Sequence, residues 1–393
     1  MTMAAAMQSR TAESPARSKA SRIAHVDIVT DLAEAETVWR AFEESGHLFT
    51  PYQRFDLLTP WQRLVGSHEG ASPFIVIARD AERQPLLLLP LSLRQGHGVR
   101  TACFMGGKHT TFNMGLWNAE FAAEVAIADL DALLAPLREH ADVLALTQQP
   151  LRWHDQHNPF AQLPRQSAIN GCPLLAMEPG GPPTSRISNS FRRRLKSKEK
   201  KLQALAGYRY NLATTDADVT RLLDWFFRVK PARMAEQKLP NVFAEPGVEA
   251  FIRSACLSAR GEGRVIDIHA LECDDEVIAI FAGVADGQRF SMMFNTYTMS
   301  EHARYSPGLI LMRYIIDRYA ERGYRSLDLG IGSDDYKRLF CKSNEPIFDS
   351  FIPLSQRGKL VASVMSGLNR TKRLVKHNPA LLEMAQKLRN AFS

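Results

Sequence analysis

Two segments of this chain share one layout: an apolar strand, a short acidic turn and a second apolar strand. The first reads PFIVIARDAERQPLLLLPLSL over residues 73–93, and the second reads VIDIHALECDDEVIAIFAGVA over residues 265–285. Helical patterns precede each segment, and a third strand, a helix and a short strand follow it. The match lies in pattern and hardly in identity, and it predicts an internal duplication. Such elements are buried in mostly antiparallel mixed sheets flanked by helices, so the expected fold class is α+β.

A proline-rich stretch separates the two halves. Residues 150–185 hold seven prolines and three glycines, a density that breaks regular structure and is typical of a connector. The predicted division is a disordered tail over 1–22, an N-terminal half over 23–150, a connector over 151–185, a C-terminal half over 186–355 and basic C-terminal helices over 356–393. The tail lacks the apolar centre of a secretory signal.

Composition and motif spacing exclude several classes of protein. With 45% hydrophobic and 23% charged residues, the chain is not wholly disordered. No apolar run reaches the roughly 18–20 residues that a membrane-spanning helix needs. The five cysteines are scattered and form no C-x-x-C pair, which argues against a disulfide scaffold or a zinc cluster and predicts a reducing, cytoplasmic location. Complete P-loop, dinucleotide and serine-hydrolase motifs are missing. His154 and His157 fall in the connector, so no metal is expected.

The net charge of +7 comes from three short basic segments. Residues 1–22 carry +3, while residues 192–201 and 357–376 carry +6 each, which indicates particular anionic partners. Residues 186–206 predict a helix with one apolar face and seven mutually repelling bases on the other. A solvated face is one reading of these bases. A site for a cofactor phosphate, an acidic substrate or RNA is the other.

The basic segment 357–377 also has two readings. Leu360, Val364, Leu368 and residues 374–375 recur at helical spacing beside Lys and Arg. This layout is found in helices that lie on anionic membranes. We expect the segment to pack against the second half of the protein, with membrane contact as the alternative.

The start of a helix at YSPGLIL is the first candidate binding site. Ser306 is the expected N-cap residue and Pro307 the first helical residue. Because the helix follows a meander of strands, unpaired amides of Gly308, Leu309 and Ile310 would point out of the sheet edge. Such a helix start attracts phosphate. The same residues are also explained by a well-capped helix alone.

The segment LDLGIGSDDYKRLF is the second candidate site. It gathers carboxylates, a phenol and an ammonium within ten residues: Asp328, Asp334, Asp335, Tyr336 and Lys337. These groups can act as general base, general acid and anion clamp. A turn that needs Gly and Asp would explain Gly330, Gly332 and Asp334 without any function.

In order and spacing, these motifs resemble a known family. The run YSPGLILMRYIIDRYAERGYRSLDLGIGSDDYKRLF, preceded by SFRRRLKSKEKKLQALAG and by an N-terminal HLFTPYQRFDLLTPW, is similar to the acetyltransferases typified by the cellulose-biosynthesis protein CelD, within the GNAT superfamily. The resemblance implies tandem GNAT-like domains. It also implies transfer of an acyl group from acetyl-CoA or another acyl-CoA to an amine or a hydroxyl, in exopolysaccharide or cell-envelope biosynthesis.

Acyl transfer from a thioester needs a base for the acceptor, donors for the oxyanion and an acid for the departing thiolate. We expect Asp328 or Asp335 to act as the base and Tyr336 as the acid. The acyl donor is expected to bind at Ser306, Gly308, Leu309, Arg193 and Arg194, and the acceptor at Lys337, Tyr305 and Asn295.

Departures from the family pattern leave other functions open. After Arg304, the chain lacks one glycine of the usual GNAT phosphate loop and has Pro307, which removes an amide donor. FemAB-like transferases share the tandem layout and move an aminoacyl group from tRNA to a cell-wall precursor. Residues 192–201 would then contact RNA or lipid-linked pyrophosphate. A third reading is a non-catalytic partner of a polysaccharide synthase at the membrane.

Overall fold

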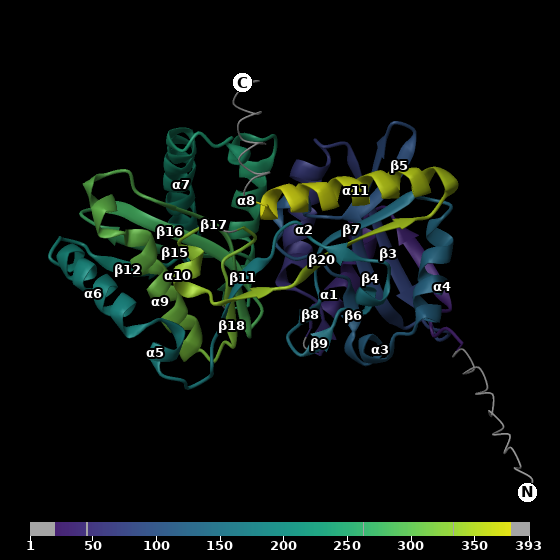
Figure 1. The fold of residues 1–393 in the computed structure, drawn as a ribbon, viewed down its shortest axis with the longest axis horizontal. Coiled ribbons are helices and arrows are strands. Elements are labelled where there is room, and N and C mark those ends of the chain that lie inside the picture. Colours follow the sequence, from purple (N-terminus) through teal and green to yellow (C-terminus); the bar gives the residue numbers. More distant parts are fainter. Residues whose placement is uncertain (1–19, 45, 262, 333, 379–393) are drawn as a thin grey trace, which may run out of the picture.

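The computed structural model describes residues 20–378 except 45, 262 and 333 (Figure 1). The tail expected over 1–22 falls almost entirely outside these residues, as does the part of the expected C-terminal helices beyond residue 378. The chain forms two large sheets with helices against them. This confirms the predicted class of mixed sheets flanked by helices.

The first sheet has nine strands, with β5 and β7 paired in parallel and its other described pairs antiparallel. Across the sheet run β1 (His25–Val29), β3 (Ala71–Arg79), β4 (Pro85–Gly96), β5 (Val99–Phe104), β7 (Val143–Pro150), β20 (Ile347–Pro353) and β10 (Gln166–Ser167). β6 (Leu116–Asn118) pairs with β4 and with β2 (His47–Leu48).

The second sheet has seven strands, with β17 and β18 paired in parallel and its other described pairs antiparallel. The order is β12 (Arg209–Leu212), β15 (Asp267–Cys273), β16 (Glu276–Ala285), β17 (Arg289–Tyr297), β18 (Ser326–Asp328), β11 (Cys172–Ala176) and β19 (Ser343–Glu345). Two short hairpins complete the strands: β8 (Arg152–Trp153) with β9 (Gln156–His157), and β13 (Ala259–Arg260) with β14 (Gly263–Arg264).

The helices lie on both faces of the sheets. They are α1 (Leu32–Phe42), α2 (Phe55–Trp61), α3 (Ala119–Glu124), α4 (Ile127–Leu137), α5 (Pro183–Arg186), α6 (Asn189–Gln203), α7 (Asp216–Glu236), α8 (Val248–Leu257), α9 (Pro307–Glu321), α10 (Lys337–Phe340) and α11 (Gln356–His377). Successive side chains of β16 point to opposite faces of the second sheet, so they belong to two different parts of the core. Ile280 and Ala282 are buried with residues of α7 and α8, whereas Ala279 and Phe281 are buried with residues of α6 and α9.

The two sheets repeat one layout, in agreement with the predicted duplication. β3, β4 and β5 form a meander in the first sheet, and β15, β16 and β17 form the corresponding meander in the second. Helices then lead to the parallel strands β7 and β18. Beyond these, β20 pairs with β7 and β11 pairs with β18. The strand expected near residues 347–354 thus joins the first sheet, and the expected connector supplies a strand to the second.

Local sequence explains the elements around the later site. α9 begins at Pro307, whose fixed φ suits a first helical turn, and ends just before Gly323, whose φ is 81°. The turn between β15 and β16 consists of Asp274 and Asp275, with φ of 48° and 57°. Two-residue hairpin turns need positive φ at both positions, a conformation that Asp tolerates.

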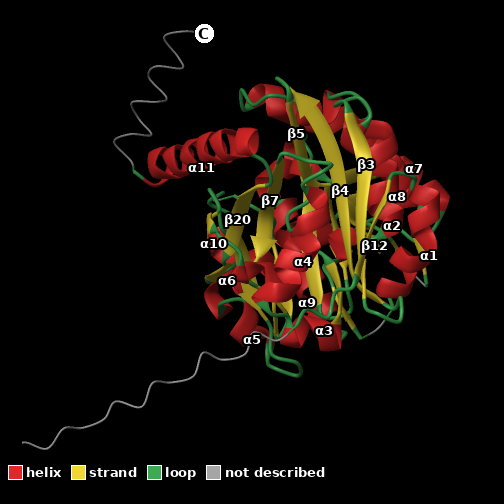
Figure 2. Cartoon of the chain, turned by 90° about the vertical axis from the view of Figure 1, so that its right-hand side faces the viewer, coloured by secondary structure: helices red, strands yellow, loops and turns green. Residues whose placement is uncertain are grey.

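α11 packs on the first sheet, so the expectation that it packs against the second half is wrong. Val361, Ala362 and Met365 form a small apolar cluster with residues of β5, β7 and β20. Gly358 lies so close to the chain at Asp142 that an added Cβ would stand 1.8 Å from the Asp142 carbonyl oxygen. In Figure 2, α11 lies at the margin of the molecule.

The five cysteines, all within the described residues, are free thiols. Among the described residues, no helix combines the length and the apolar character that crossing a bilayer requires.

Candidate active site

The candidate site lies where the parallel strands β17 and β18 end. The two strands pair only from Arg289 with Ser326 to Ser291 with Asp328, and β17 then continues to Tyr297. α9 is the crossover between them, so its first turn lies near the carboxyl end of β17. In open α/β arrangements, ligands bind outside the carboxyl ends of such strands.

The start of α9 differs from the expected row of free amides. Ser306 is in a left-handed conformation with φ of 57° and gives no side-chain cap. Its carbonyl oxygen accepts hydrogen bonds from the amides of Leu309 (3.0 Å) and Ile310 (3.2 Å). Pro307 has no N–H group, so among the described residues the Gly308 amide alone of this turn lacks a hydrogen-bond partner. One amide, rather than three, is available to an anion here.

A cation from α6 reaches the same turn. The ammonium of Lys198 donates a hydrogen bond of 2.7 Å to the hydroxyl of Ser306. Lys198 belongs to the basic segment of the sequence, and its charge adds to the positive end of the α9 dipole. The helix start is therefore electropositive although few of its amides are free.

Gly308 packs on the end of β17. A Cβ added to Gly308 would lie 3.7 Å from Cδ1 of Tyr297 and 3.8 Å from Cε2 of Phe281, both ordinary contact distances. Phe281 is the cross-strand partner of Asn295, and Asn295 lies two residues before Tyr297 on the same face of β17. These side chains form a floor that begins at the α9 helix start.

Tyr336 reaches this floor from the other candidate segment. Its hydroxyl accepts a hydrogen bond of 3.0 Å from the side-chain amide of Asn295 and lies 3.9 Å from the sulfur of Met292. Burial raises the pKa of the Tyr336 phenol above its ordinary value, so the group stays protonated at neutral pH. The start of α9 and the Tyr336 phenol thus both lie against side chains near the end of β17.

Asp328 does not belong to an accessible site. It is fully buried, and its carboxylate accepts hydrogen bonds from Arg289 Nε (2.9 Å), Ser291 Oγ, Cys172 Sγ and the Gly330 amide. A carboxylate with four donors and no exposed surface cannot take a proton from a substrate. Its role is to join β11, β17 and β18, and the expectation that it serves as a base is wrong on these grounds.

The other charged residues of this segment separate into an exposed and a buried group. The Asp335 side chain is fully exposed, 4.0 Å from Arg338. Lys337 is buried instead, and its ammonium donates to the carbonyl oxygens of Gly330 (3.2 Å) and Ile331 (3.0 Å). The Lys337 ammonium therefore holds the loop after β18, and this contradicts its expected contact with substrate.

The basic face of α6 is partly explained by packing. Arg192 forms a bidentate pair with Asp317 of α9, with both distances 2.7 Å, and Glu199 pairs with Arg313 at 2.7 Å. Arg193 and Arg194 are exposed, and the guanidinium of Arg194 lies 5.0 Å from the ring centroid of Phe191. Tyr305, expected to contact the acceptor, packs at the edge of the α9 core, beneath the guanidinium of Arg304.

Two cations of α7 at this strand end were missed by sequence reasoning. The guanidinium of Arg233 stacks 3.6 Å from the ring centroid of Tyr297. Lys230 is half-buried, and burial together with the charge of Arg233 lowers the pKa of its ammonium, against the opposing effect of Asp334. Neither cation pairs with a carboxylate within the described part of the chain. No spacing signal could reveal them, because more than sixty residues separate them from the helix start.

A groove of about 930 Å³ runs beside this corner. It is lined along α7 by residues from Asp216 to Val229, and on the other side by Asp275–Val277 and Thr298–Ser300. Its lining contains none of the residues expected from the sequence. The groove reaches the segment directly after Tyr297, so it adjoins the candidate site without filling it.

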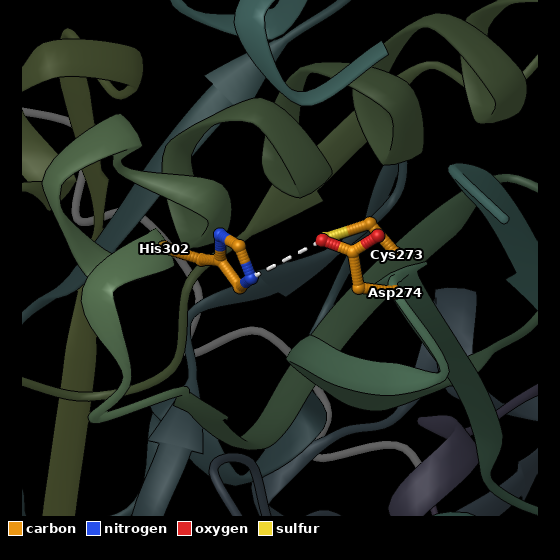
Figure 3. Close-up of side chains that lie close together, drawn as sticks. All are labelled: Cys273, Asp274 and His302. Carbon is orange, nitrogen blue, oxygen red and sulfur yellow. Dashed lines mark ion pairs between the residues drawn. The ribbon is translucent and has the colours of Figure 1, made fainter. Parts of the chain in front are cut away.

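A cluster of possible metal ligands lies at the β15–β16 turn (Figure 3). The sulfur of Cys273, a carboxylate oxygen of Asp274 and an imidazole nitrogen of His302 lie within 4.8 Å of one another. His302 Nε2 is 3.8 Å from Asp274 and 3.9 Å from Glu276. These contacts tie the turn to the segment that enters α9. The expectation of a metal-free protein stays a prediction.

Residues 189–338 match the family described as acetyltransferase (GNAT) domain. A comparison with curated proteins finds no match. The solved structures that match include the C-terminal domain of a lysylphosphatidylglycerol synthetase from Agrobacterium fabrum, with TM-score 0.51 and 11% identity over 87% of this chain and 97% of that one.

Two further solved structures match over nearly their whole length. FemX has a TM-score of 0.54 and 8% identity, over 83% of this chain and 98% of its own. A conserved protein of unknown function from Bacteroides thetaiotaomicron has a TM-score of 0.52 and 14% identity, over 83% and 99%. At these identities the similarity establishes the fold alone.

Proposed function

We propose that the protein is an acyl-CoA-dependent N- or O-acyltransferase of the CelD-like kind, because residues 189–338 match the family described as acetyltransferase (GNAT) domain. Its place would be exopolysaccharide or cell-envelope biosynthesis in the cytoplasm. The observation that carries this proposal is the meeting of two elements on β17. The Gly308 helix start and the Tyr336 phenol both contact the floor formed by Asn295, Tyr297 and Phe281.

The donor's phosphates would bind at the electropositive start of α9. The Gly308 amide would give one hydrogen bond, with the hydroxyl of Ser306 beside it, and Lys198 contributes a positive charge next to this turn. The Leu309 amide would not bind the donor, because it already donates to the carbonyl oxygen of Ser306. Arg233 and Lys230 have no carboxylate partner among the described residues. Their positive charges would bind the donor's phosphates in place of the backbone amides that this loop does not offer. Exposed Arg193 and Arg194 would meet outlying phosphates.

The chemical step would use the protonated phenol of Tyr336. The acceptor's nitrogen or oxygen attacks the thioester carbon, a new N–C or O–C bond forms, and the C–S bond breaks. The acceptor's proton passes to the base, for which Asp335 remains the candidate with an exposed carboxylate. Tyr336 gives its proton to the departing thiolate. Asn295, which donates to the Tyr336 oxygen, would orient the phenol.

A calorimetric titration with a panel of acyl-CoAs, followed by an acyl-transfer assay, tests the proposal. The expected result is saturable binding of one acyl-CoA class, weakened by Arg233→Ala. The matched control is Arg228→Ala on the same helix. Absence of binding for the whole panel would overturn the proposal. Unchanged turnover of both Tyr336→Phe and Asp335→Asn would remove the assigned catalytic residues.

Transfer of an aminoacyl group from tRNA is a second candidate. The exposed arginines of α6 favour it, and so does the similarity to FemX, although that similarity extends to the fold alone. Affinity for tRNA that falls steeply with salt, together with no affinity for acyl-CoA, would select this function. A protein that binds neither donor and co-purifies with a membrane synthase would be the non-catalytic partner.

A further inference from the structure

α11 has one buried face and one outward face that no described residue covers. The buried face rests on the first sheet through Val361, Ala362 and Met365. On the outward face, Leu360, Val364, Leu368 and Leu374 are 71%, 52%, 57% and 66% exposed. They rank among the most exposed large apolar side chains of the described chain. Their spacing places them in one stripe along the helix.

The charge of α11 is of one sign. Residues 356–377 contain six lysines and arginines and no aspartate or glutamate. At 100° per residue, Lys372 falls beyond one edge of the apolar stripe, and Lys359 and Arg370 fall beyond the other. Arg357 falls within the stripe, at its N-terminal end. None of the six bases forms an ion pair with a residue that the structure describes. Arg370 and Lys376 donate hydrogen bonds to the side chains of Gln166 and Asn170, both neutral. No described carboxylate therefore neutralises the positive charge of this helix.

Two hollows beside the C-terminal half of α11 are also basic. One, of about 630 Å³, is lined by Arg370, Arg373 and Leu374 together with residues 166–167 and 378. The other, of about 550 Å³, includes Lys376 of α11. It also includes the exposed bases Arg338 and Lys342, whereas Lys337 in its lining is buried and pairs with Asp334 at 3.3 Å. Positive charge thus continues from the helix onto the adjoining surface.

We propose that the outward face of α11 binds the surface of an anionic lipid bilayer. The apolar stripe would enter the boundary between headgroups and acyl chains, and the flanking bases would contact lipid phosphates. Each base near an anionic surface contributes about fivefold in affinity, an effect that salt weakens. The proposal does not depend on the proposed acyl transfer, since α11 lies on the other sheet.

A second copy of this chain fits the same face less well. A symmetric dimer would place the stripe of one copy on the stripe of the other. Twelve bases and no acid from the two helices would then face one another, which is unfavourable. An anionic bilayer satisfies the apolar and the basic groups together, so charge complementarity selects the lipid surface.

Flotation of the full chain with vesicles tests the proposal. One set is phosphatidylcholine alone and the other contains one quarter phosphatidylglycerol. Wild-type protein is expected to float with the anionic vesicles only, and to be released in 0.5 M salt. Arg357→Gln/Lys372→Gln is expected to weaken binding by more than about tenfold. Leu360→Ser/Leu368→Ser is expected to do the same.

Matched controls separate this face from general effects. Ile127→Ser/Leu239→Ser alters two leucine-sized side chains of similar exposure elsewhere, and Arg63→Gln/Arg138→Gln removes two exposed charges outside α11. Both are expected to float as wild type does. Light scattering reports the oligomeric state of each variant. A wild-type protein that ignores anionic vesicles would overturn the proposal. Two other results would also overturn it: both α11 variants float as wild type does, or the wild-type protein is a dimer that Leu360→Ser/Leu368→Ser dissociates.

Discussion

The side-chain amide of Asn295, near the end of β17, donates a 3.0 Å hydrogen bond to the phenol oxygen of Tyr336 in the loop that follows β18. Two residues further along β17, Tyr297 contacts the start of α9 at Gly308. One strand therefore connects the candidate acid with the candidate phosphate site. These two features, with the exposed carboxylate of Asp335 beside Tyr336 in the sequence, define where chemistry is expected.

Tyr336→Phe is expected to lower kcat of acyl transfer by about 100-fold, because general acid catalysis contributes roughly 10²–10⁴. Donor affinity should change little, since the ring remains in place. The lost hydrogen bond should lower the free energy of unfolding by about 1 kcal/mol. Tyr210→Phe is the control, because it also removes a hydrogen-bonded hydroxyl, the one 2.8 Å from His269. Steady-state kinetics in which both variants behave alike would contradict an acid role for Tyr336.

Gly308→Ala separates donor binding from folding. The new Cβ would meet its neighbours at 3.7 Å or more, so the fold is expected to tolerate it. Alanine lowers the conformational entropy of the unfolded chain, so the free energy of unfolding should rise by about 0.5 kcal/mol. The methyl group would cover part of the floor at Tyr297 and Phe281, against which the donor is proposed to lie, so the Kd for acyl-CoA should rise about tenfold.

The control for Gly308→Ala is a glycine that needs its conformational freedom. Gly323→Ala, at φ of 81° after α9, should lower the free energy of unfolding by about 1 kcal/mol and leave donor affinity unchanged. Calorimetry and thermal unfolding measure both quantities. A Gly308→Ala protein that binds acyl-CoA as well as wild type does would place the phosphates elsewhere.

The sequence predicts local elements well where the signals are local. The alternation of apolar residues gave both hairpins, and Pro307 with Gly323 marked the limits of α9. The partner of a strand is different, because it depends on contacts between distant segments. Nothing in their residues says that β20, from the C-terminal half, completes the first sheet, or that β11, from the connector, completes the second. The packing of α11 on the first sheet was missed for the same reason.

Asp328 shows why the site was predicted only in part. Alternation along β18 correctly separates Asp328 from its apolar neighbours, and such a polar face suggests access to solvent. In the structure the first half of the protein covers it. The rings of Phe112 and Trp153 lie 4.7 and 4.6 Å from the guanidinium of Arg289, the partner of Asp328. Contacts between the halves bury what the strand alone would expose.

Asp328→Asn is expected to destabilise the fold rather than to remove a base. Breaking a buried ion pair costs about 3–5 kcal/mol, because the remaining guanidinium of Arg289 loses its compensating charge. The exposed side chain of Asp335 offers the matched control, and Asp335→Asn should change the free energy of unfolding by less than about 0.5 kcal/mol. Urea titration measures both. An Asp328→Asn protein as stable as wild type but inactive would restore the catalytic role.

His269 should make the fold sensitive to mild acid. It is fully buried between the hydroxyls of Tyr210 (2.8 Å) and Tyr319 (3.1 Å). Burial, with the nearby charges of Arg318 and Arg322, lowers the pKa of His269 to about 3. The unfolded chain binds this proton below its ordinary pKa of about 6.5, whereas the folded chain does not. The neutral His269 therefore contributes its full share to the free energy of unfolding above about pH 6.5, and this contribution is lost as the pH falls towards 3.

The size of the effect follows from the width of that window. One proton taken up on unfolding gives a slope of about 1.4 kcal/mol per pH unit, so about 2 kcal/mol should disappear between pH 6.5 and 5. His269→Gln should be less stable than wild type at pH 7 and should lose less stability on acidification. His157→Gln, at an exposed histidine, should keep the wild-type slope. Urea unfolding of the three proteins at pH 7 and 5 measures this difference, and parallel losses in all three would show that His269 is protonated in the folded state as well.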